Sequence, residues 1–565
     1  MDNQLPSDFD LIIVGTGMVE SILSAAASRI GKRVLHIDRN DYYGGQWASF
    51  NLDAIQKIKE KQHYILEDAN KLLQQDEYIT SIGNDLFNIE NVVFNWHIPE
   101  KASSEDVNNP SEFMEEKGQL ELGDNTNPEA WTKESLLKET RKFNIDLTPK
   151  LQYARGDFVE LLISSNIARY SEYRSVSRVL TWLNGQLEVV PCSRSDVFAN
   201  SKVSVIEKRM LMKLLTSLDD GGAELKSYTN KTFRAFLKDR KLTPDLIHYV
   251  LYAISMSTDD TPCIEGVENT KRFLNSLGRF GKTPFLFSMY GSGEITQAFC
   301  RLSAVFGGIF ALSQPISGYI FDDGGFKALL VGEQRIKADH IVMGIEKAPV
   351  KFVETVPKTY ISRAVLITDR SILDSEKEHL TLLLYPPEGG KCSVTLIELG
   401  TLTGTCPKGL FLIHLISRQN TNPEEDFKHV VDSLFITNGA NETEPSCKPR
   451  VLWSFYFSIA DTNGVDLKQN VPKNTYICPG PDIDMDFDLA IKEAKKIFAE
   501  LYPETEFLPR APDPEEIIIG GEEEATEEST DTGDKEKGGG DTVVEELVRN
   551  IQNQDIEDTL DRDAA

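Results

Sequence analysis

The sequence lacks the segments that would place it in a membrane or send it out of the cytosol. No stretch approaches the roughly 18–20 uninterrupted apolar residues that span a bilayer. The N-terminal MDNQLPSDFD is acidic and polar, unlike a signal or transit peptide. The C-terminal DRDAA does not match a prenylation motif. We therefore expect a cytosolic protein.

Side chains that form metal or nucleophilic sites are also scarce. The seven cysteines are odd in number and include no CxxC pair, which favours a reduced protein without a disulfide framework or a zinc site. The eight histidines stand singly, with no HxxxH pair. YGSGE (290–294) contains a serine between glycines but does not complete a nucleophile elbow. The sequence predicts no catalytic residues and no metal ligands.

Positive charge is scarce, and the excess of acids is concentrated at the C-terminus. The formal net charge is −29, and residues 515–565 carry 18 acids and 4 bases. This segment is rich in Gly, Thr and Glu and nearly lacks aromatic residues, which is typical of disorder. An acidic chain is also a poor ligand for phosphate backbones, so we expect no nucleic-acid partner.

The residues from Leu11 to Asn40 predict a strand–helix–strand unit. DLIIV (10–14) is a short apolar run that ends at a glycine, as a buried parallel strand does. MVESILSAAASRI (18–30) has apolar residues at helical spacing, and RVLHID (33–38) is a second strand. Such a unit favours the right-handed parallel form that opens dinucleotide-binding folds.

The glycine-rich turn of this unit departs from a working phosphate loop. Gly15 and Gly17 can form the tight turn and let a pyrophosphate approach, and Asp38 stands where a ribose-binding acid is expected. Glu20 replaces the third glycine, near the helix N-terminus where the pyrophosphate would lie. A charged glutamate there would repel a diphosphate. We expect a flavoprotein-like fold without bound flavin, and active dinucleotide binding is the alternative.

Five blocks of the chain, spread over 8–505, resemble the superfamily of Rab GDP-dissociation inhibitors and Rab escort proteins. The blocks are residues 8–50 with RNDYYGGQWASF, KFNIDLTPKLQYARGDFVELLISSNIARYSEYRSV (142–176), VSVIEKRMLMKLL (203–215), LGRFGKTPFLFSMYGSGEITQAFCRLSAVFGGIFAL (277–312) and YICPGPDIDMDFDLAIKEAKKIFAELYP (476–503). WASF after the tyrosine–glycine motif, the extra length, and LTPDLIHYVLYAISMSTDD (242–260) favour the escort branch.

The resemblance implies a binding function rather than catalysis. An escort protein acts as component A of Rab geranylgeranyltransferase: it holds GDP-bound Rab GTPases, presents them to the α/β transferase heterodimer, shields the geranylgeranyl groups and delivers the Rab to membranes. One alternative is a Rab GDP-dissociation inhibitor, which recycles prenylated Rabs. Another is an FAD-dependent amine oxidase or desaturase, which shares the N-terminal unit and the closing strand and helix.

The resemblance also implies the contact residues. Tyr43, Glu294, Arg301, Ile309 and Ala311 match family positions that contact Rab, although Ile309 and Ala311 differ from the commonest residues there. An aromatic beside two glycines can give a large contact area at low entropic cost. A packed turn tyrosine remains the alternative for Tyr43, and a solvated charge pair remains the alternative for Glu294 and Arg301.

A second group of implied contacts lies in the expected helical domain. Phe236 and Ile247 match positions that contact the transferase in escort proteins, and an exposed phenylalanine would be a natural anchor. A core phenylalanine remains the alternative. The family also implies that these helices open a groove for the prenyl chain, but the sequence does not separate such a groove from an ordinary helical core.

These expectations combine into a multidomain α/β fold. The predicted parts are a flavoprotein-like domain with mixed sheets (1–145 and 276–510) that carries a polar insertion at about 65–140, an all-helical domain (146–275), and a disordered acidic tail (511–565).

Overall fold

The N-terminal unit of the computed structural model has the predicted strand–helix–strand form. β1 (Asp8–Val14) is followed by α1 (Met18–Arg29) and by β2 (Val34–Ile37), and the two strands are parallel. Gly17 is the N-cap residue of α1, which therefore begins at the expected turn. The structure describes residues 4–58, 72–82, 89–100, 131–193, 196, 204–220, 225–437, 448–462 and 464–510.

The first sheet extends this unit and mixes parallel with antiparallel strands. Besides β1 and β2, the described strands of this sheet are β4 (Tyr78–Thr80), β12 (Ile309–Ala311), β13 (Ile316–Asp322), β14 (Gly325–Val331), β15 (Gln334–Gly344) and β21 (Thr475–Cys478). The order is β12-β2-β1-β15-β14-β13-β4, and β21 pairs with β15. Leu11 and Ile13 face one hydrophobic cluster, and Ile12 and Val14 face another. Because successive side chains of a strand point to opposite faces, β1 is buried on both sides.

A second sheet contains mainly antiparallel strands. Its described strands are β5 (Glu90–Trp96), β9 (Arg178–Leu183), β10 (Gln186–Val189), β16 (Thr359–Thr368), β17 (Thr381–Tyr385), β18 (Val394–Leu399), β19 (Phe411–Arg418) and β20 (Val451–Asp461). They follow the order β10-β9-β17-β18-β19-β16-β20-β5. Smaller sheets are formed by β3 (Ser49–Phe50) with β6 (Ile145–Asp146), and by β7 (Gln152–Tyr153), β11 (Phe285–Ser288) and β8 (Tyr173–Ser175).

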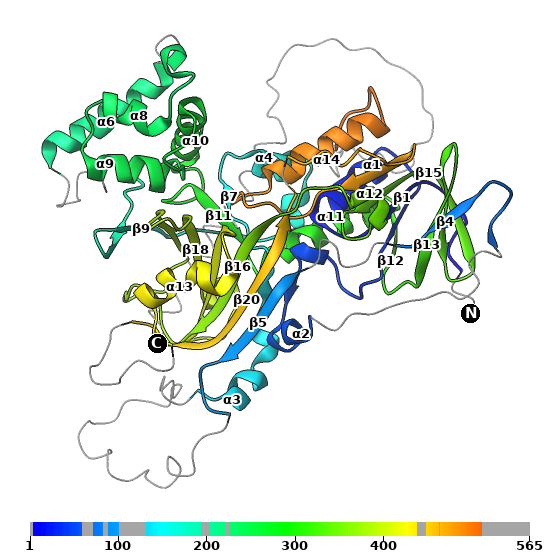
Figure 1. Cartoon of the computed structure of the whole chain (residues 1–565), viewed down its shortest axis with the longest axis horizontal. Helices are drawn as coiled ribbons and strands as arrows, with labels where there is room; N and C mark the ends of the chain where they lie inside the picture. The colour runs from blue at the N-terminus through cyan, green and yellow to red at the C-terminus, as the bar shows by residue number, and fades with distance from the viewer. Residues whose placement is uncertain are drawn as a thin grey trace, which may run out of the picture.

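Helices cover the first sheet and also form a separate lobe. The remaining described helices are α2 (Leu52–Gln56), α3 (Lys133–Lys138), α4 (Asp157–Ser164), α6 (Val205–Asp220), α8 (Phe233–Asp239), α9 (Pro244–His248), α10 (Cys263–Ser276), α11 (Gly293–Val305), α12 (Val350–Val353), α13 (Pro423–Leu434) and α14 (Asp488–Leu501), with the π-helix η7 (Tyr249–Ile254). Short 3₁₀ turns are η1 (Gly45–Trp47), η4 (Thr140–Lys142), η5 (Ile167–Tyr170), η6 (Lys226–Tyr228) and η8 (Thr401–Thr403). Helices α1, α11 and α14 share one hydrophobic cluster, whereas α6, α8, α9 and α10 form the helical lobe, drawn in green in Figure 1.

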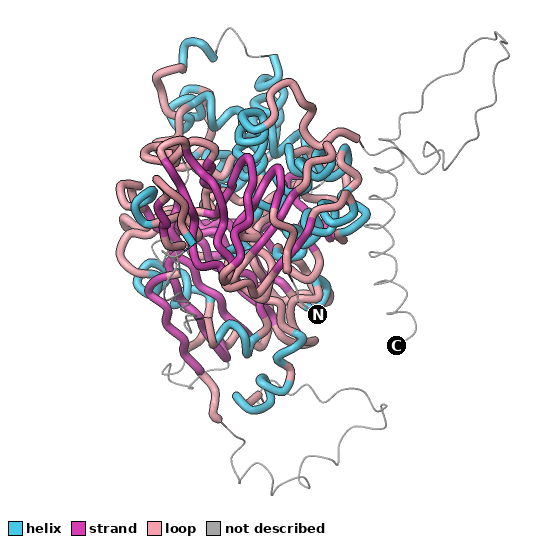
Figure 2. The backbone as a smooth tube through the Cα atoms, turned by 90° about the vertical axis from the view of Figure 1, so that its right-hand side faces the viewer, coloured by secondary structure: helices cyan, strands magenta, loops and turns pink. Residues whose placement is uncertain are grey.

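The two views agree on the arrangement of sheets and lobe. Figure 2 shows the strands running through the middle of the molecule and the helical lobe above them. The lobe joins the body through α10, where Arg272 pairs with Asp486 at 2.8 Å and with Asp488. The predicted α/β class, with mixed sheets and a group of helices apart from them, is confirmed.

The predicted character of two segments needs correction. The segment 146–275 is not all-helical, because its first third contributes strands, and β9 joins the second sheet beside β17. The segment 65–140 is not only a polar insertion, since β4 and β5 each complete the edge of a sheet. Both strands pair with residues far away in the sequence, so they could not be predicted from the mostly polar residues around them. The polar stretch 102–130 and the tail 511–565 lie outside the described residues.

Candidate functional site

The turn after β1 is filled by a carboxyl group. Glu20 is 2 % exposed and folds back over the turn, so a Cβ atom placed on Gly17 would lie 2.6 Å from Glu20 Oε2. A Cβ atom on Gly15 would lie 3.5 Å from Glu20 Oε1, and one on Gly344 at the end of β15 would overlap the same oxygen. The carboxyl group therefore occupies the backbone surface that a pyrophosphate has to approach in this fold.

Asp38, the residue expected at a ribose, is engaged within the protein. Its Oδ2 accepts hydrogen bonds from the Thr16 amide at 3.1 Å and from the Thr16 hydroxyl at 3.0 Å. Its Oδ1 accepts from the Asn40 amide at 3.1 Å and lies 3.0 Å from Lys347 Nζ. Both partners of this ion pair are buried, so the bond holds the end of β2 to the turn that follows β15.

The electrostatics of the turn correct one expectation. Burial, and secondly the neighbouring Glu346, raise the pKa of Glu20 well above its ordinary range. Burial also raises the pKa of Glu346. Because both shifts favour the neutral carboxyl, Glu20 blocks the turn by its volume, and the expected charge repulsion is not needed. The residues present do not fit the pyrophosphate of a dinucleotide.

A partner-binding surface can be built from Tyr43, which lies between the end of β2 and η1. Its ring is half-buried, and its centroid lies 6.3 Å from that of Phe310 in an edge-to-face arrangement. Burial raises the pKa of Tyr43, and Cys300 on α11 is the second cause. Tyr43 therefore lies beside both α11 and β12, with part of its ring open to solvent.

Helix α11 supplies two charged groups to this surface. Glu294 in its first turn and Arg301 two turns later are both exposed, as predicted for residues on one helix face. The guanidinium of Arg301 lies over the ring of Tyr170 at 5.2 Å from the centroid, which steadies the long side chain. Gln297 donates to Glu294 Oε1 at 3.4 Å. The structure thus brings Tyr43 and α11 together.

The edge strand β12 completes the surface and corrects one predicted residue. Ile309 is 36 % exposed, whereas Ala311 is only 7 % exposed and packs into the core. Ala311 is therefore wrong as a direct side-chain contact in this conformation. It shares a strand face with Ile309, but it lies further along β12 and is covered by the hydrophobic cluster that contains Ile37, its neighbour on β2. The backbone carbonyl of Ala311 accepts from the Asp38 amide at 3.0 Å. Phe310, which the sequence analysis did not select, is half-buried and contacts both Tyr43 and His36.

We call Tyr43, Glu294, Arg301, Ile309 and Phe310 the platform. An aromatic residue between two positions that resemble family contacts is a signal that could have pointed to Phe310. The platform offers two aromatic rings and an aliphatic side chain beside an acid and a base. Such a surface suits a protein partner better than a small molecule, because aromatic residues and arginine are enriched where proteins meet.

The predicted anchor in the helical lobe is buried. Phe236 is 1 % exposed, and its ring packs edge-on against Tyr228 at 5.0 Å and parallel to Phe233 at 6.0 Å. Ile247 on α9 is 7 % exposed and belongs to the same hydrophobic cluster. The expectation of an exposed phenylalanine is wrong for this conformation, because Phe236 lies on the inner face of α8. Whether the two residues contact a partner stays a prediction.

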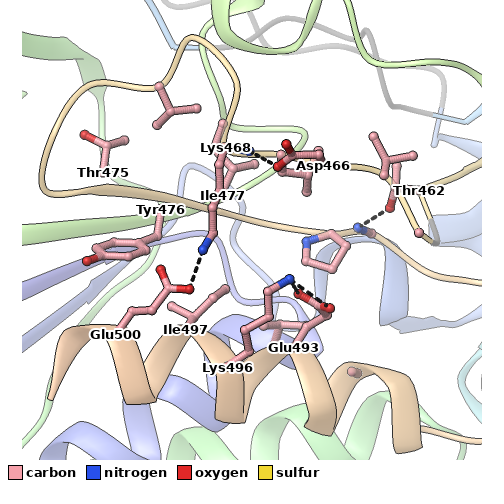
Figure 3. Close-up of a pocket in the computed structure, with 18 of the residues that line it drawn as sticks. Thr462, Asp466, Lys468, Thr475, Tyr476, Ile477, Glu493, Lys496, Ile497 and Glu500 are labelled. Atoms are coloured by element: carbon pink, nitrogen blue, oxygen red, sulfur yellow. Dashed lines mark hydrogen bonds and ion pairs between the residues drawn. The ribbon is translucent and has the colours of Figure 1, made fainter. Parts of the chain in front are cut away.

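A cavity of about 490 Å³ lies apart from the platform, between the loop that follows β20 and helix α14. Figure 3 shows Lys468 reaching from this loop to Glu500 on α14, and Lys496 pairing with Glu493 at 3.1 Å. The residues described as lining this cavity include no histidine, cysteine or serine.

Two further observations concern metal ions and membranes. Among the described residues, no group of three or more His, Cys, Asp or Glu side chains could hold a metal ion. No helix in the described part of the chain is long and apolar enough to cross a membrane.

Comparison with known proteins identifies relatives over nearly the whole length. Residues 1–80 match the family model described as GDP dissociation inhibitor, and residues 361–483 match the model described as RAE1/2 domain I, C-terminal region. The chain is 35 % identical to Rab proteins geranylgeranyltransferase component A 1 of Rattus norvegicus, covering 92 % of this chain and 95 % of that protein. It is 36 % identical to component A of Drosophila melanogaster, with 93 % and 94 % covered.

A solved structure shows the same fold. The Rab GDI of Plasmodium falciparum superposes with a TM-score of 0.61 at 18 % sequence identity, covering 88 % of this chain and 99 % of that chain.

Proposed function

Because the chain belongs to the Rab escort protein family, whose members are named component A of Rab geranylgeranyltransferase, we propose that it binds GDP-bound, unprenylated Rab GTPases and presents them to the transferase. The observation that carries this proposal is the similarity to component A proteins, which extends over more than nine-tenths of this chain and of its relatives. The site that supports it is the platform.

The platform binds the GTPase through a combination of area and charge. The exposed part of the Tyr43 ring, with Phe310 packed against it, supplies an aromatic contact, and the exposed Ile309 on β12 adds an aliphatic one. Glu294 and Arg301 supply one charge of each sign on the neighbouring helix. Charged groups at the rim of a contact set orientation and association rate more than affinity, so the aromatic centre contributes most of the binding free energy.

The chain contributes binding rather than catalysis. The names of its relatives as component A support an accessory role, and the described lining of the cavity beside α14 includes no histidine, cysteine or serine. We also propose that no flavin acts here. This is supported by Glu20, which occupies the surface a pyrophosphate would need, and by Lys347, which already pairs with Asp38. The binding takes place in the cytosol.

The helical lobe docks the transferase and handles the prenyl groups that the Rab acquires. Burying each CH₂ group contributes about 0.8 kcal/mol, so a carrier needs an apolar surface comparable to a membrane. In the described conformation α8 and α10 pack directly, since a Cβ atom on Gly266 would overlap the Phe233 ring. A lipid that entered between these helices would have to separate them. Phe236 and Ile247 lie on α8 and α9, and delivery of the prenylated Rab brings the protein to membranes transiently.

A prenylation assay tests the function directly. Transferase, unprenylated Rab and geranylgeranyl diphosphate are incubated with and without this chain, and lipid incorporation is measured. We expect incorporation only with the chain present. Incorporation that is unaffected by the chain contradicts an escort role.

The fold shared with a Rab GDI makes a GDP-dissociation inhibitor the second candidate. It is distinguished by extraction of prenylated Rab from membranes without support of prenyl transfer. A third outcome, stoichiometric flavin in the purified protein with oxidase activity, would favour an enzyme of the amine oxidase or desaturase class.

A further inference from the structure

The first turn of α11 is held by a buried carboxylate from another part of the chain. The amide of Ser292 donates to both oxygens of Asp146, at 3.0 Å and 2.9 Å. The hydroxyl of Ser49 donates to Asp146 Oδ1 and accepts from the Gly293 amide at 3.0 Å. Asp146 is fully buried, on β6. The first amides of a helix have no partner within the helix, and a negative group there is favoured.

This contact explains the glycines of YGSGE, which no catalytic function requires. A Cβ atom on Gly291 would lie 2.6 Å from Asp146 Oδ1 and 2.6 Å from Ser49 Oγ. A Cβ atom on Gly293 would lie 2.7 Å from both the backbone nitrogen and the hydroxyl of Ser49. Any side chain at either position would push α11 away from Asp146 and Ser49. The motif therefore permits a close approach between segments distant in the sequence.

The same carboxylate is tied to the segment that carries Tyr43. Ser49 pairs with Asp146 across the β3–β6 ladder, and it follows Tyr43 after the short turn η1. Two more bonds join these segments, from the Leu147 amide to the Ala48 carbonyl at 3.2 Å and from the Thr148 hydroxyl to the Gln46 carbonyl at 3.0 Å. Asp146 thus contacts both the segment that carries Tyr43 and the start of α11, the helix that carries Glu294 and Arg301.

We propose that Asp146, together with Ser49, is a positioning residue that sets the separation of Tyr43 from Glu294 and so determines affinity for the GTPase. This inference rests on the proposed function. Neither residue belongs to the platform, and both act through it. An asparagine at 146 keeps the shape but turns one acceptor into a donor that faces the Ser292 amide. The hydroxyl of Ser49 bridges the two segments, so its loss separates them while leaving the fold of each intact.

The chain offers a matched control. Asp426 in the first turn of α13 is also buried, and it accepts from the Ser362 hydroxyl at 2.6 Å and from the amides of Asn420 and Thr421 at 3.0 Å. It lies against the second sheet and holds no element of the platform. Asp426→Asn therefore replaces a comparable buried, hydrogen-bonded carboxyl group without touching the platform.

The test measures Rab·GDP affinity and amide hydrogen exchange in the full-length protein. We expect Asp146→Asn and Ser49→Ala to weaken binding about tenfold and to speed exchange at the Ser292 and Gly293 amides. Ser49→Thr, which keeps the hydroxyl, should bind the Rab as tightly as wild type, and exchange at the Ser292 and Gly293 amides should remain as slow as in wild type. Asp426→Asn should lower the melting temperature while leaving affinity and exchange at these amides unchanged.

Three outcomes count against these ideas in different ways. If Asp146→Asn binds as tightly as wild type, Asp146 does not position the platform. If Asp426→Asn loses as much affinity as Asp146→Asn, the loss reports general destabilisation and the inference fails. A wild-type protein that binds no Rab contradicts the proposed function instead, and the exchange data then still decide whether Asp146 holds the start of α11.

Discussion

Lys347 Nζ lies 3.0 Å from Asp38 Oδ1, and both side chains are buried. Asp38 has the position of the acid that binds ribose in dinucleotide folds. Here its carboxylate is paired instead with the ammonium group of Lys347, from the turn after β15. Glu20 fills the adjoining turn. The region that holds the cofactor in dinucleotide folds is therefore part of the core here, and the proposed Rab-binding surface, formed by Tyr43, α11 and β12, lies beside it.

The first prediction concerns the protonation of Glu20. Its pKa is raised well above the ordinary value, chiefly by burial. Above pH 4.5 the unfolded chain therefore releases this proton while the folded chain retains it, and the group costs stability as the pH rises. Glu20→Gln should be stabilised relative to wild type, by up to about 1.4 kcal/mol for each pH unit above 4.5, until the folded carboxyl also ionises.

Urea unfolding of wild type and Glu20→Gln between pH 4.5 and pH 8 measures this difference. Asp53→Asn serves as the control, because Asp53 is exposed and forms a surface ion pair with Lys57. A difference between Glu20→Gln and wild type that does not change with pH would mean that Glu20 is already ionised in the folded protein.

The second prediction concerns Tyr43. Tyr43→Ala removes the half-exposed ring and its contact with Phe310, so Rab·GDP affinity should fall about fivefold or more. Titration of a fluorescent Rab measures the change. Tyr78→Ala is the control, because Tyr78 is 40 % exposed but lies on β4, beneath the ammonium of Lys351. Wild-type affinity in Tyr43→Ala, or an equal loss in Tyr78→Ala, would remove Tyr43 from the platform.

The local parts of the fold could be predicted from sequence, whereas the assembled parts could not. The unit β1–α1–β2 follows from an apolar run, a glycine turn and helical spacing within about thirty residues. The edge strand β5 was not predicted, because ENVVFNW becomes a strand by pairing with β20, more than 350 positions later in the chain. Propensity within a polar region says nothing about a partner that far away.

The same limit applies to the site. Glu294 and Arg301 could be placed on one helix face because the helical period determines it. Ala311 and Phe236 were misjudged because their burial depends on what covers them. The helical period predicts which face of α8 carries Phe236. It does not predict whether that face packs against Phe233 and Tyr228 or against a partner protein.

The third prediction concerns Phe236. Phe236→Ala leaves a cavity among packed rings, so the free energy of unfolding should fall by about 3–5 kcal/mol. We also expect this variant to spare Rab binding, since the platform is elsewhere, and to weaken the ternary complex with transferase. Phe273→Ala is the matched control, because Phe273 is equally buried in the same lobe, on α10. If both variants weaken the ternary complex alike, the effect belongs to the stability of the lobe and Phe236 has no role of its own.

The fourth prediction concerns the pH dependence of the group that holds α11. Burial raises the pKa of Asp146 from 3.8 to about 6, against the hydrogen bonds from Ser49 and Ser292 and the charge of Arg363 on β16, which lower it. Between pH 4 and pH 6 the folded chain therefore holds a proton that the unfolded chain has lost. By linkage, the stability contributed by Asp146 falls as the pH rises through this window, by about 3 kcal/mol in all.

Asp146→Asn has no such proton, so the wild-type minus variant difference in unfolding free energy should decrease between pH 4 and pH 6 and stay constant above pH 7. Urea unfolding at fixed ionic strength measures it, because other groups cancel in the difference. The opposite slope would mean that the hydrogen bonds from Ser49 and Ser292 outweigh burial. In that case Asp146 stabilises the start of α11 as a carboxylate far below neutral pH, and its pKa lies under 3.8 rather than above it.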